Sequence, residues 1–136
     1  MKRRPRPQPD GAVLRQGELE LSIFVRAGEA YGDRPLYHEI VDLASCAGLR
    51  GATVVRGLQG FGARASLRPT GFAWRSGNEP VLIQITDDAA RVRAFLPAAE
   101  QLVGSGLIVT KAVTSVRRAT DVPDIAASTA TGGCVS

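Results

Sequence analysis

The spacing of apolar residues predicts the same order of elements twice along this chain. Each time the order is strand, then helix, then strand. In the first half, apolar and polar residues alternate over Leu19–Val25, which is the period of a half-buried strand. Helical spacing follows over Leu36–Ala47, with Pro35 suited to the first helical position and Gly48 ending the helix. β-branched residues then predict a second strand over Ala52–Leu58.

The second half repeats this order after a long glycine-rich loop. A strand is expected over Val81–Thr86, and Asp87 or Asp88 then caps a second helix. Because Pro97 has no backbone N–H, it removes an internal hydrogen bond, and we expect the helix to kink or break just before it. A fourth strand is expected over Leu107–Val116. The predicted buried stripe of the second helix consists of Val92, Phe95, Leu96, Ala99 and Leu102.

Two such units predict an α+β fold, the ferredoxin-like βαββαβ arrangement, with a four-stranded antiparallel sheet and two helices on one face. The other face of the sheet is then uncovered. A monomer would expose an apolar surface of the kind that marks an interaction site, so we expect a closed homo-oligomer, most simply a homotrimer. We expect the folded domain over residues 18–118, between a disordered basic arm (residues 1–17) and a disordered tail (residues 119–136).

The basic character of the chain is concentrated near its N-terminus. Of the 136 residues, 17 are basic and 13 are acidic. The excess of four is accounted for by Lys2, Arg3, Arg4, Arg6 and Arg15 against Asp10. The remaining chain is near neutral, which argues against nucleic-acid binding, since that needs contiguous basic residues on the folded body. A nucleic-acid module that uses the arm stays an alternative, with binding that falls steeply with salt.

Several functional classes find no support in the residue pattern. The chain has no apolar run of the ~20 residues that a membrane-spanning helix requires, and no secretion-signal core. We therefore expect a cytoplasmic protein without direct membrane insertion. Cys46 and Cys134 form neither a C-x-x-C pair nor part of a zinc-ligand set, so no metal site is expected. No catalytic triad can be assigned from spacing and no Walker-type loop is present, so we expect no catalytic residues and no enzyme activity.

The stretch Gly51–Gly62 leads from a predicted strand directly into a turn punctuated by glycines. Glycine permits backbone angles and a close ligand approach that other residues resist. The chain between Leu43 and Asn78 contains five arginines and no acidic residue, so a loop formed there projects positive potential into water. These features together predict an anion-binding edge.

Four segments carry a family resemblance: Tyr31–Tyr37 (YGDRPLY), Gly51–Gly62 (GATVVRGLQGFG), Phe95–Pro97 (FLP) and Gly106–Thr110 (GLIVT). Together they resemble the PII-like family called domain of unknown function 190, over roughly Leu19–Arg117. The resemblance implies a trimeric, ferredoxin-like relative of the PII signalling proteins. Those proteins bind adenine nucleotides between subunits and grip a target, often a membrane transporter, through the loop after strand two. Some family members are encoded beside or fused to fluoride-exporting channels.

The resemblance also implies roles for individual positions, with an adenine nucleotide as the effector and no required cofactor. Ligand binding would fall to Arg56, Gly57, Gln59, Gly60, Phe61, Gly62, Gly104, Gly106, Arg117 and Arg118. Partner binding through the long loop would fall to Arg64, Arg68, Phe72, Trp74 and Arg75. PII proteins typically have a lysine just after the turn at Gly104–Gly106, where this chain has Leu107. This departure points to a less charged nucleotide, or another anion, in place of a triphosphate.

The same positions also have structural interpretations. Arg56 fits a solvent-facing strand residue as well as it fits a ligand contact, and the three glycines after it fit a bulge or tight turn equally well. Phe61 is explained slightly better as a packing anchor than as a stacking platform. For Phe72 and Trp74 partner contact is favoured, because exposed aromatic residues beside arginines are typical interface anchors.

An acylphosphatase-like enzyme is the alternative to a regulatory protein. The segment Leu58–Arg64 superficially resembles the phosphate loop of that ferredoxin-like enzyme, in which an arginine clamps the acyl phosphate and an asparagine orients water. Placement argues against it, because the enzyme's loop joins the first strand to the first helix, whereas this segment follows the second strand. Asn78, the candidate asparagine, also lies outside any predicted strand interior.

Overall fold

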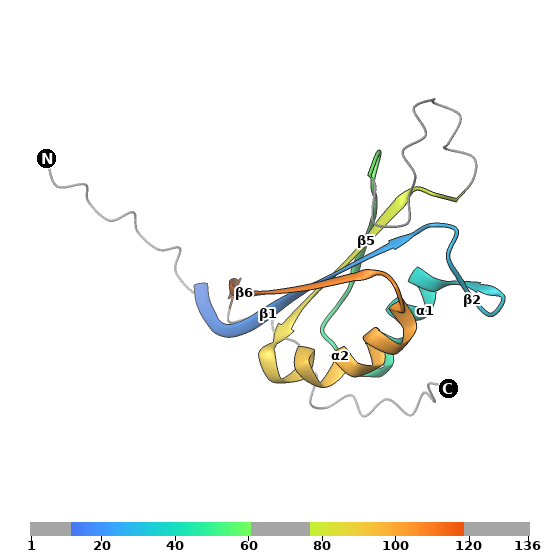
Figure 1. Cartoon of the computed structure of the whole chain (residues 1–136). Helices are drawn as coiled ribbons and strands as arrows, with labels where there is room; N and C mark the ends of the chain where they lie inside the picture. The colour runs from blue at the N-terminus through green and yellow to red at the C-terminus, as the bar shows by residue number, and fades with distance from the viewer. Residues whose placement is uncertain (1–11, 61–76, 119–136) are drawn as a thin grey trace, which may run out of the picture.

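The computed structural model describes residues 12–60 and 77–118, and all structural statements below concern these ranges. The expected loop residues 61–76 and both chain ends lie outside them. The elements, in chain order, are β1 (Ala12–Arg26), β2 (Ala30–Tyr31), β3 (Arg34–Pro35), α1 (Leu36–Cys46), β4 (Thr53–Arg56), β5 (Pro80–Asp88), α2 (Ala89–Val103) and β6 (Leu107–Arg118) (Figure 1).

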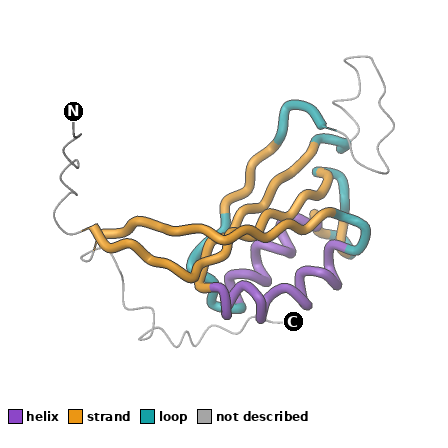
Figure 2. Tube along the Cα trace, turned by 60° about the vertical axis from the view of Figure 1, so that its left-hand side comes forward, coloured by secondary structure: helices purple, strands orange, loops and turns teal. Residues whose placement is uncertain are grey.

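Four strands form one antiparallel sheet in the order β4-β5-β1-β6. Both helices lie on one face of this sheet (Figures 1 and 2). The central pair, β1 and β5, comes from the first strand of each predicted unit, with Ile23 opposite Ile83. β2 and β3 form a short hairpin between β1 and α1. The ferredoxin-like α+β arrangement predicted from the sequence is therefore confirmed.

The core lies between the sheet and the helices. Alternate residues of the central strands, such as Ile23 and Ile83, have no exposed surface, because they face the helices. Complete burial of a side chain of this size contributes about 1.5–3 kcal/mol. The helices contribute Leu36, Ile40, Ala44, Val92, Phe95, Ala99 and Val103 to the same cluster. The register is thereby fixed, since a shift by one residue would turn each apolar set to the other face.

β1 begins at Ala12, earlier than the strand predicted from Leu19. The expected boundary of the disordered arm at residue 17 is therefore wrong for residues 12–17, which belong to this strand. The physical reason is that β6 is long enough to pair with them, from Ala12 opposite Arg118 to Arg15 opposite Ser115. The register then shifts at a β-bulge, which the alternating apolar pattern does not reveal.

α2 continues through Pro97 as one helix, so the expected break is wrong. Pro97 is exposed, while Phe95 and Ala99 on either side of it are buried and hold both halves of the helix on the sheet. The helix begins after Asp88, whose side chain makes no capping hydrogen bond. The expected cap is therefore wrong as well, and the carboxylate of Asp87 has a different partner, described below.

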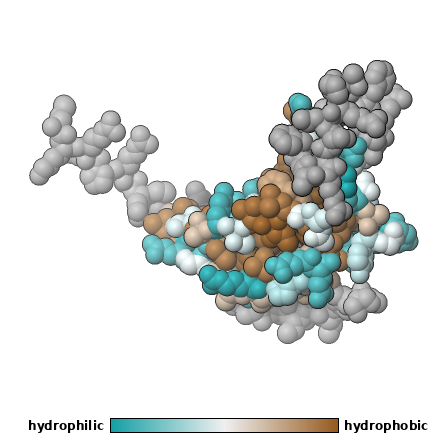
Figure 3. All heavy atoms as spheres, viewed as in Figure 1, coloured by the Kyte–Doolittle hydropathy of each residue, from teal (hydrophilic) through white to brown (hydrophobic). Residues whose placement is uncertain are grey.

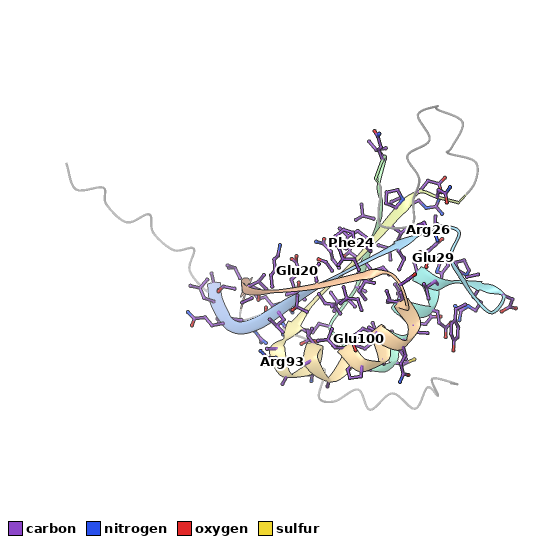
Figure 4. The ribbon with its side chains drawn as sticks, in the orientation of Figure 1. Glu20, Phe24, Arg26, Glu29, Arg93 and Glu100 are labelled. Carbon is purple, nitrogen blue, oxygen red and sulfur yellow. The ribbon has the colours of Figure 1, made fainter. Side chains whose placement is uncertain are left out.

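The sheet face opposite the helices is uncovered and partly apolar. Phe24, Val55, Leu107 and Val109 are exposed there, with Lys111 and Glu20 paired at 2.9 Å beside them. Figure 4 shows Glu20 and Phe24 pointing away from the helices, whereas Arg93 and Glu100 lie on the helix side. Apolar residues gather over the strands in Figure 3. We call these four apolar residues the open face.

Candidate functional site

The end of β4, the start of β5 and the end of β1 meet where the chain leaves the sheet at Gly60 and returns at Gly77. Backbone hydrogen bonds join these segments. The Gly57 N–H donates to the Pro80 carbonyl at 2.7 Å, and the Gly28 N–H donates to the Gly77 carbonyl at 2.7 Å. Both ends of the segment 61–76 are thus fixed to the sheet. We call Gly28, Gly57, Gly60, Gly77 and Pro80 the loop base.

Close packing leaves little room for a side chain at the glycines of the loop base. A Cβ atom added to Gly57 would lie 2.6 Å from Pro80 Cγ, and one added to Gly60 would lie 3.2 Å from the same atom. A Cβ atom on Gly28 would lie 2.8 Å from the Gly77 carbonyl oxygen. These contacts support the structural interpretation of Gly57 and Gly60. Gly28 and Gly77 form the second contact.

Arg56 ends β4 beside the loop base, with an exposed side chain. Its cross-strand partner is the buried Val81, which places Arg56 on the helix side of the sheet. Its Nη2 atom lies 3.4 Å from the hydroxyl oxygen of Tyr37, to which it donates, and Tyr37 stacks on His38 with ring centroids 4.5 Å apart. The Tyr37 hydroxyl raises the pKa of Arg56, with a smaller contribution from Glu79. Tyr37 was not predicted as a neighbour of the site.

The turn at Gly104–Gly106 lies at the same end of the sheet, because Leu107 pairs with Phe24 near the end of β1. Two backbone N–H groups of this turn already donate hydrogen bonds within the fold. The Gly104 N–H donates to the Glu100 carbonyl at 3.2 Å, and the Gly106 N–H donates to the Val103 carbonyl at 3.1 Å. A Cβ atom on Gly106 would also lie 2.8 Å from the Phe24 carbonyl oxygen. A phosphate at this turn would therefore have to compete for two of its amides.

The remaining predicted site residues are separated from this end or lie outside the described ranges. Arg117 and Arg118 end β6 at the opposite end of the sheet, opposite Val13 and Ala12. Within one chain, Arg117 and Arg118 are therefore separated from Arg56 by the length of the sheet. Gln59 is exposed next to Gly60. The predicted residues outside the described ranges are Phe61, Gly62, Arg64, Arg68, Phe72, Trp74 and Arg75.

A buried ionic cluster occupies the sheet end away from the loop base. Arg50, just before β4, donates from Nη1 to Glu18 at 2.6 Å, from Nε to Asp87 at 2.9 Å and from Nη2 to Asp88 at 2.9 Å. Its backbone N–H also donates to Asp87 at 2.9 Å. Glu18 and Asp87 have completely buried side chains. Sequence reasoning missed this cluster because each acid had a simpler local explanation, as a surface strand residue or a helix cap.

The charges of this cluster stabilise one another. Burial alone would raise the pKa of Glu18, but the Ser115 hydroxyl and Arg50 act more strongly, and its pKa lies below the ordinary value. Glu18 Oε2 and Ser115 Oγ are buried without a hydrogen bond of standard geometry, so the hydroxyl acts as a nearby dipole. Asp87 likewise has a lowered pKa, because hydrogen bonds from Asp88 and Arg50 outweigh burial. The arrangement is suited to holding the fold together, because the buried carboxylates of Glu18 and Asp87 bind the nearly buried Arg50.

Other site types have little support in the described ranges. No group of three or more His, Cys, Asp or Glu residues there could hold a metal ion. Within the same ranges, no helix has the length and hydropathy needed to cross a bilayer. A cavity of about 250 Å³ beside the end of α1 is lined by Val41, Ala44, Ser45, Leu49, Arg50, Gly51 and Ala52. Because the Arg50 side chain already binds three carboxylates, this cavity offers a ligand no free charge.

Comparison with known proteins gives matches at both the sequence and the fold level. The family model DUF190 (Uncharacterized ACR, COG1993) matches residues 18–115. A UPF0166 protein of Aquifex aeolicus (strain VF5) is 30% identical over 95 residues, covering 68% of this chain and 88% of the relative. A UPF0166 protein of Methanocaldococcus jannaschii is 30% identical over 90 residues, covering 65% and 82%.

A similar fold is found in CPII, a nitrogen regulatory PII-like protein from Thiomonas intermedia K12. The solved structure of CPII bound to ADP, AMP and bicarbonate matches with a TM-score of 0.53. The match covers 78% of this chain and 92% of CPII, at 18% sequence identity. At that identity the similarity shows a shared fold.

Proposed function

Because the chain belongs to the DUF190 family and has the fold of a PII-like protein, we propose that it is a PII-like regulatory protein. In this proposal a small anionic effector, an adenine nucleotide, binds between subunits at the loop base. The effector then changes how the segment 61–76 contacts a partner. The observation that carries the proposal is the exposed Arg56 guanidinium at the root of that segment, with both ends of the segment fixed by the loop base.

The electrostatics of Arg56 support an anionic ligand. Its hydrogen-bond partner is the neutral hydroxyl of Tyr37, so its positive charge is available to an anion. Arg34, near the same end, is different, because Glu39 and Asp42 already bind its guanidinium. A phosphate group would find the positive charge of Arg56 available, whereas the charge of Arg34 is already neutralised. Arg56 is therefore the better anchor for the phosphates.

The effector we propose carries fewer than three phosphates. Leu107 stands where PII proteins typically have a lysine, and the amides of Gly104 and Gly106 donate to α2 carbonyls. Both features reduce the number of groups that could neutralise a triphosphate. ADP and AMP, which are bound in the structure of CPII, suit such a site.

A homotrimer would complete this site. Arg117 and Arg118 lie at the opposite end of the sheet from Arg56, so they could join it only from a neighbouring subunit. Phe24, Val55, Leu107 and Val109 of the open face give the neighbour an apolar contact surface. In the trimer that we propose, each loop base lies next to the long β6 of another copy.

We place the protein in the cytoplasm, with a membrane transporter or channel as its partner. The predicted partner-binding residues are Arg64, Arg68, Phe72, Trp74 and Arg75. The role is regulatory in this proposal, without catalysis. A benzoyl phosphate assay separates it from the acylphosphatase-like alternative. Turnover that disappears in Arg64→Ala would contradict the regulatory role.

Isothermal titration of the purified oligomer against AMP, ADP, ATP and bicarbonate tests the effector. We expect saturable binding of ADP or AMP that exceeds binding of ATP. Arg56→Ala should weaken nucleotide binding about tenfold, the scale of a charge-assisted hydrogen bond of 1.5–3 kcal/mol taken at its lower end. Arg34→Ala is the matched control and should leave the affinity unchanged. Absence of binding by every nucleotide would overturn the nucleotide proposal.

A further inference from the structure

The sheet face opposite the helices is arranged in rows that cross the strands. Cross-strand partners lie side by side on one face, so the register of the sheet assigns each row. In the order β4-β5-β1-β6, the row nearest the loop base is entirely apolar and consists of Val55, Leu82, Phe24 and Leu107. Figure 4 shows Phe24 pointing away from the helices. An apolar row that spans the sheet is stabilised when a further surface covers it.

The next two rows of this face are polar apart from Val109. The first consists of Thr53, Gln84, Ser22 and Val109, and the second contains Thr86, Glu20 and Lys111. Lys111 Nζ lies 2.9 Å from Glu20 Oε1, and Gln84 Nε2 donates to the same oxygen at 3.5 Å. The side chains of Glu20 and Lys111 are 20% and 64% exposed. An ion pair thus shares this face with the apolar row.

The Glu20–Lys111 ion pair can accept further partners without breaking. A lysine ammonium has three donors, and an ionised carboxylate accepts at both of its oxygens. The contacts of Glu20 with Lys111 and Gln84 both use Oε1, so Oε2 is a second acceptor on the same side chain. A surface that covers this face could therefore add a cation at Glu20 and an anion at Lys111.

We propose that Glu20 and Lys111 select the orientation in which copies of this chain join through this sheet face. This selection rests on the proposed homotrimer, whose contact it makes specific. A second copy fits both charges, because it offers an ammonium to each carboxylate and a carboxylate to each ammonium. The apolar row supplies contact area, and the charges exclude orientations in which like charges meet. A lipid bilayer or a nucleic acid would instead select one sign of charge.

Reversal of single charges tests the proposal. Glu20→Lys places two cations side by side on the face, and Lys111→Glu places two anions there. Each variant should lose self-association, which light scattering at micromolar concentration measures as the mass of a single chain. The double variant Glu20→Lys/Lys111→Glu restores a pair of opposite charges and should regain the mass of the parent.

Capture between the two single variants tests whether the charges meet across copies. In co-expressed pairs, tagged Glu20→Lys should retain untagged Lys111→Glu about tenfold more than it retains untagged Glu20→Lys, because only the first pair joins opposite charges. The preference should shrink at high salt, which screens charges near the surface.

Glu100→Lys and Arg93→Glu are the matched controls. They make the same changes of charge on α2, at exposed positions on the helix side of the sheet (Figure 4). Both should keep the mass of the parent. A thermal melt of each variant distinguishes dissociation from unfolding.

Each other outcome contradicts the proposal. Self-association of Glu20→Lys at the level of the parent would overturn it and leave the homotrimer standing, since the contact would then not include the ion pair. Single variants that dissociate but do not capture each other would also overturn it, as would dissociation of Glu100→Lys. A parent that is a single chain would overturn both this selection and the homotrimer. Isothermal titration of that parent with ADP then decides separately whether the chain binds the effector.

Discussion

Arg50 connects residues that are far apart in the sequence, and its side chain is almost completely buried together with those of Glu18 and Asp87. It is the cation shared by Glu18, Asp87 and Asp88. Arg50→Met should lower the free energy of unfolding by about 3–5 kcal/mol, because it removes the guanidinium that offsets the buried charges of Glu18 and Asp87. Arg50→Lys should recover only part of this, since one ammonium cannot reproduce a planar fork. Urea unfolding measures both variants.

Arg34→Met is the control for this change. Arg34 also binds two carboxylates, but its side chain is half exposed, so solvent already screens its charge. We expect its unfolding curve to resemble that of the parent. A loss of stability as large as that in Arg50→Met would contradict the assigned role of burial.

Acid should weaken the protein through the same cluster. Glu18 and Asp87 have pKa values below their ordinary values of 4.5 and 3.8 in the folded state. Their contribution to stability is therefore fully present above about pH 4.5 and is lost as pH falls through the folded-state pKa values. Urea midpoints measured from pH 7 to pH 2.5 should fall mainly below pH 4.5. In Glu18→Gln this fall should be smaller, and an unchanged pH dependence would exclude Glu18 as a contributor.

The close contact between Gly57 and Pro80 in the loop base predicts a loss of stability when Gly57 is replaced. Gly57→Ala should destabilise the protein by about 1–3 kcal/mol, because the new Cβ atom would meet Pro80 Cγ at 2.6 Å. Gly51→Ala is the matched control, since a Cβ atom there meets nothing within 4 Å and the backbone φ is not positive. Thermal unfolding compares the two. Equal melting temperatures would show that the Gly57 contact relaxes without cost.

At the scale of elements, α2 contains Pro97 in its interior. It still forms one helix, because Phe95 and Ala99 pack it against the sheet. Pro97→Ala should stabilise the protein by about 1–3 kcal/mol, because it restores an N–H to the helix interior and removes a ring clash. Pro35→Ala should change little, since Pro35 precedes α1 and removes no internal hydrogen bond. Calorimetry measures both. A lower melting temperature for Pro97→Ala would mean that the helix uses the proline to fit the sheet.

The apolar period was sufficient to predict the order and type of the main elements. The strand alternation around Ile23 and Ile83 and the helical spacing around Ile40 each reflect one buried face, which local sequence encodes directly. The failures depend on partners distant in sequence. The early start of β1 needs β6, the continuity of α2 needs the sheet beneath Phe95, and the role of Asp87 needs Arg50.

The candidate site also combines features that local sequence encodes with features that depend on residues distant in the sequence. The glycine-rich turn after Arg56 could be located from composition, but its contact with Pro80 joins positions separated by the whole segment 61–76. Tyr37 belongs to one of the segments that carry the family resemblance, but no periodicity links it to Arg56. The predicted ligand roles of Gly104, Gly106, Arg117 and Arg118 rest on the family resemblance and stay predictions.

At the scale of the whole molecule, the open face determines whether the proposed site can exist. Val109→Asp places a carboxylate among exposed apolar residues of β6 and should dissociate the proposed homotrimer, which light scattering measures as a lower mass. Ala90→Asp, on an exposed position of α2, should leave the mass unchanged. A parent protein that is already a stable monomer at micromolar concentration would contradict the proposed trimer.

The contacts at the root of the segment 61–76 are made by residues outside that segment. The packing of the sheet and helices therefore does not depend on the sequence of the segment. Gly57 with Pro80, and Gly28 with Gly77, already close the chain there. Doubling the length of such an insertion costs only about 0.6 kcal/mol in closure entropy. Insertions into this segment should consequently cost the sheet and helices little stability.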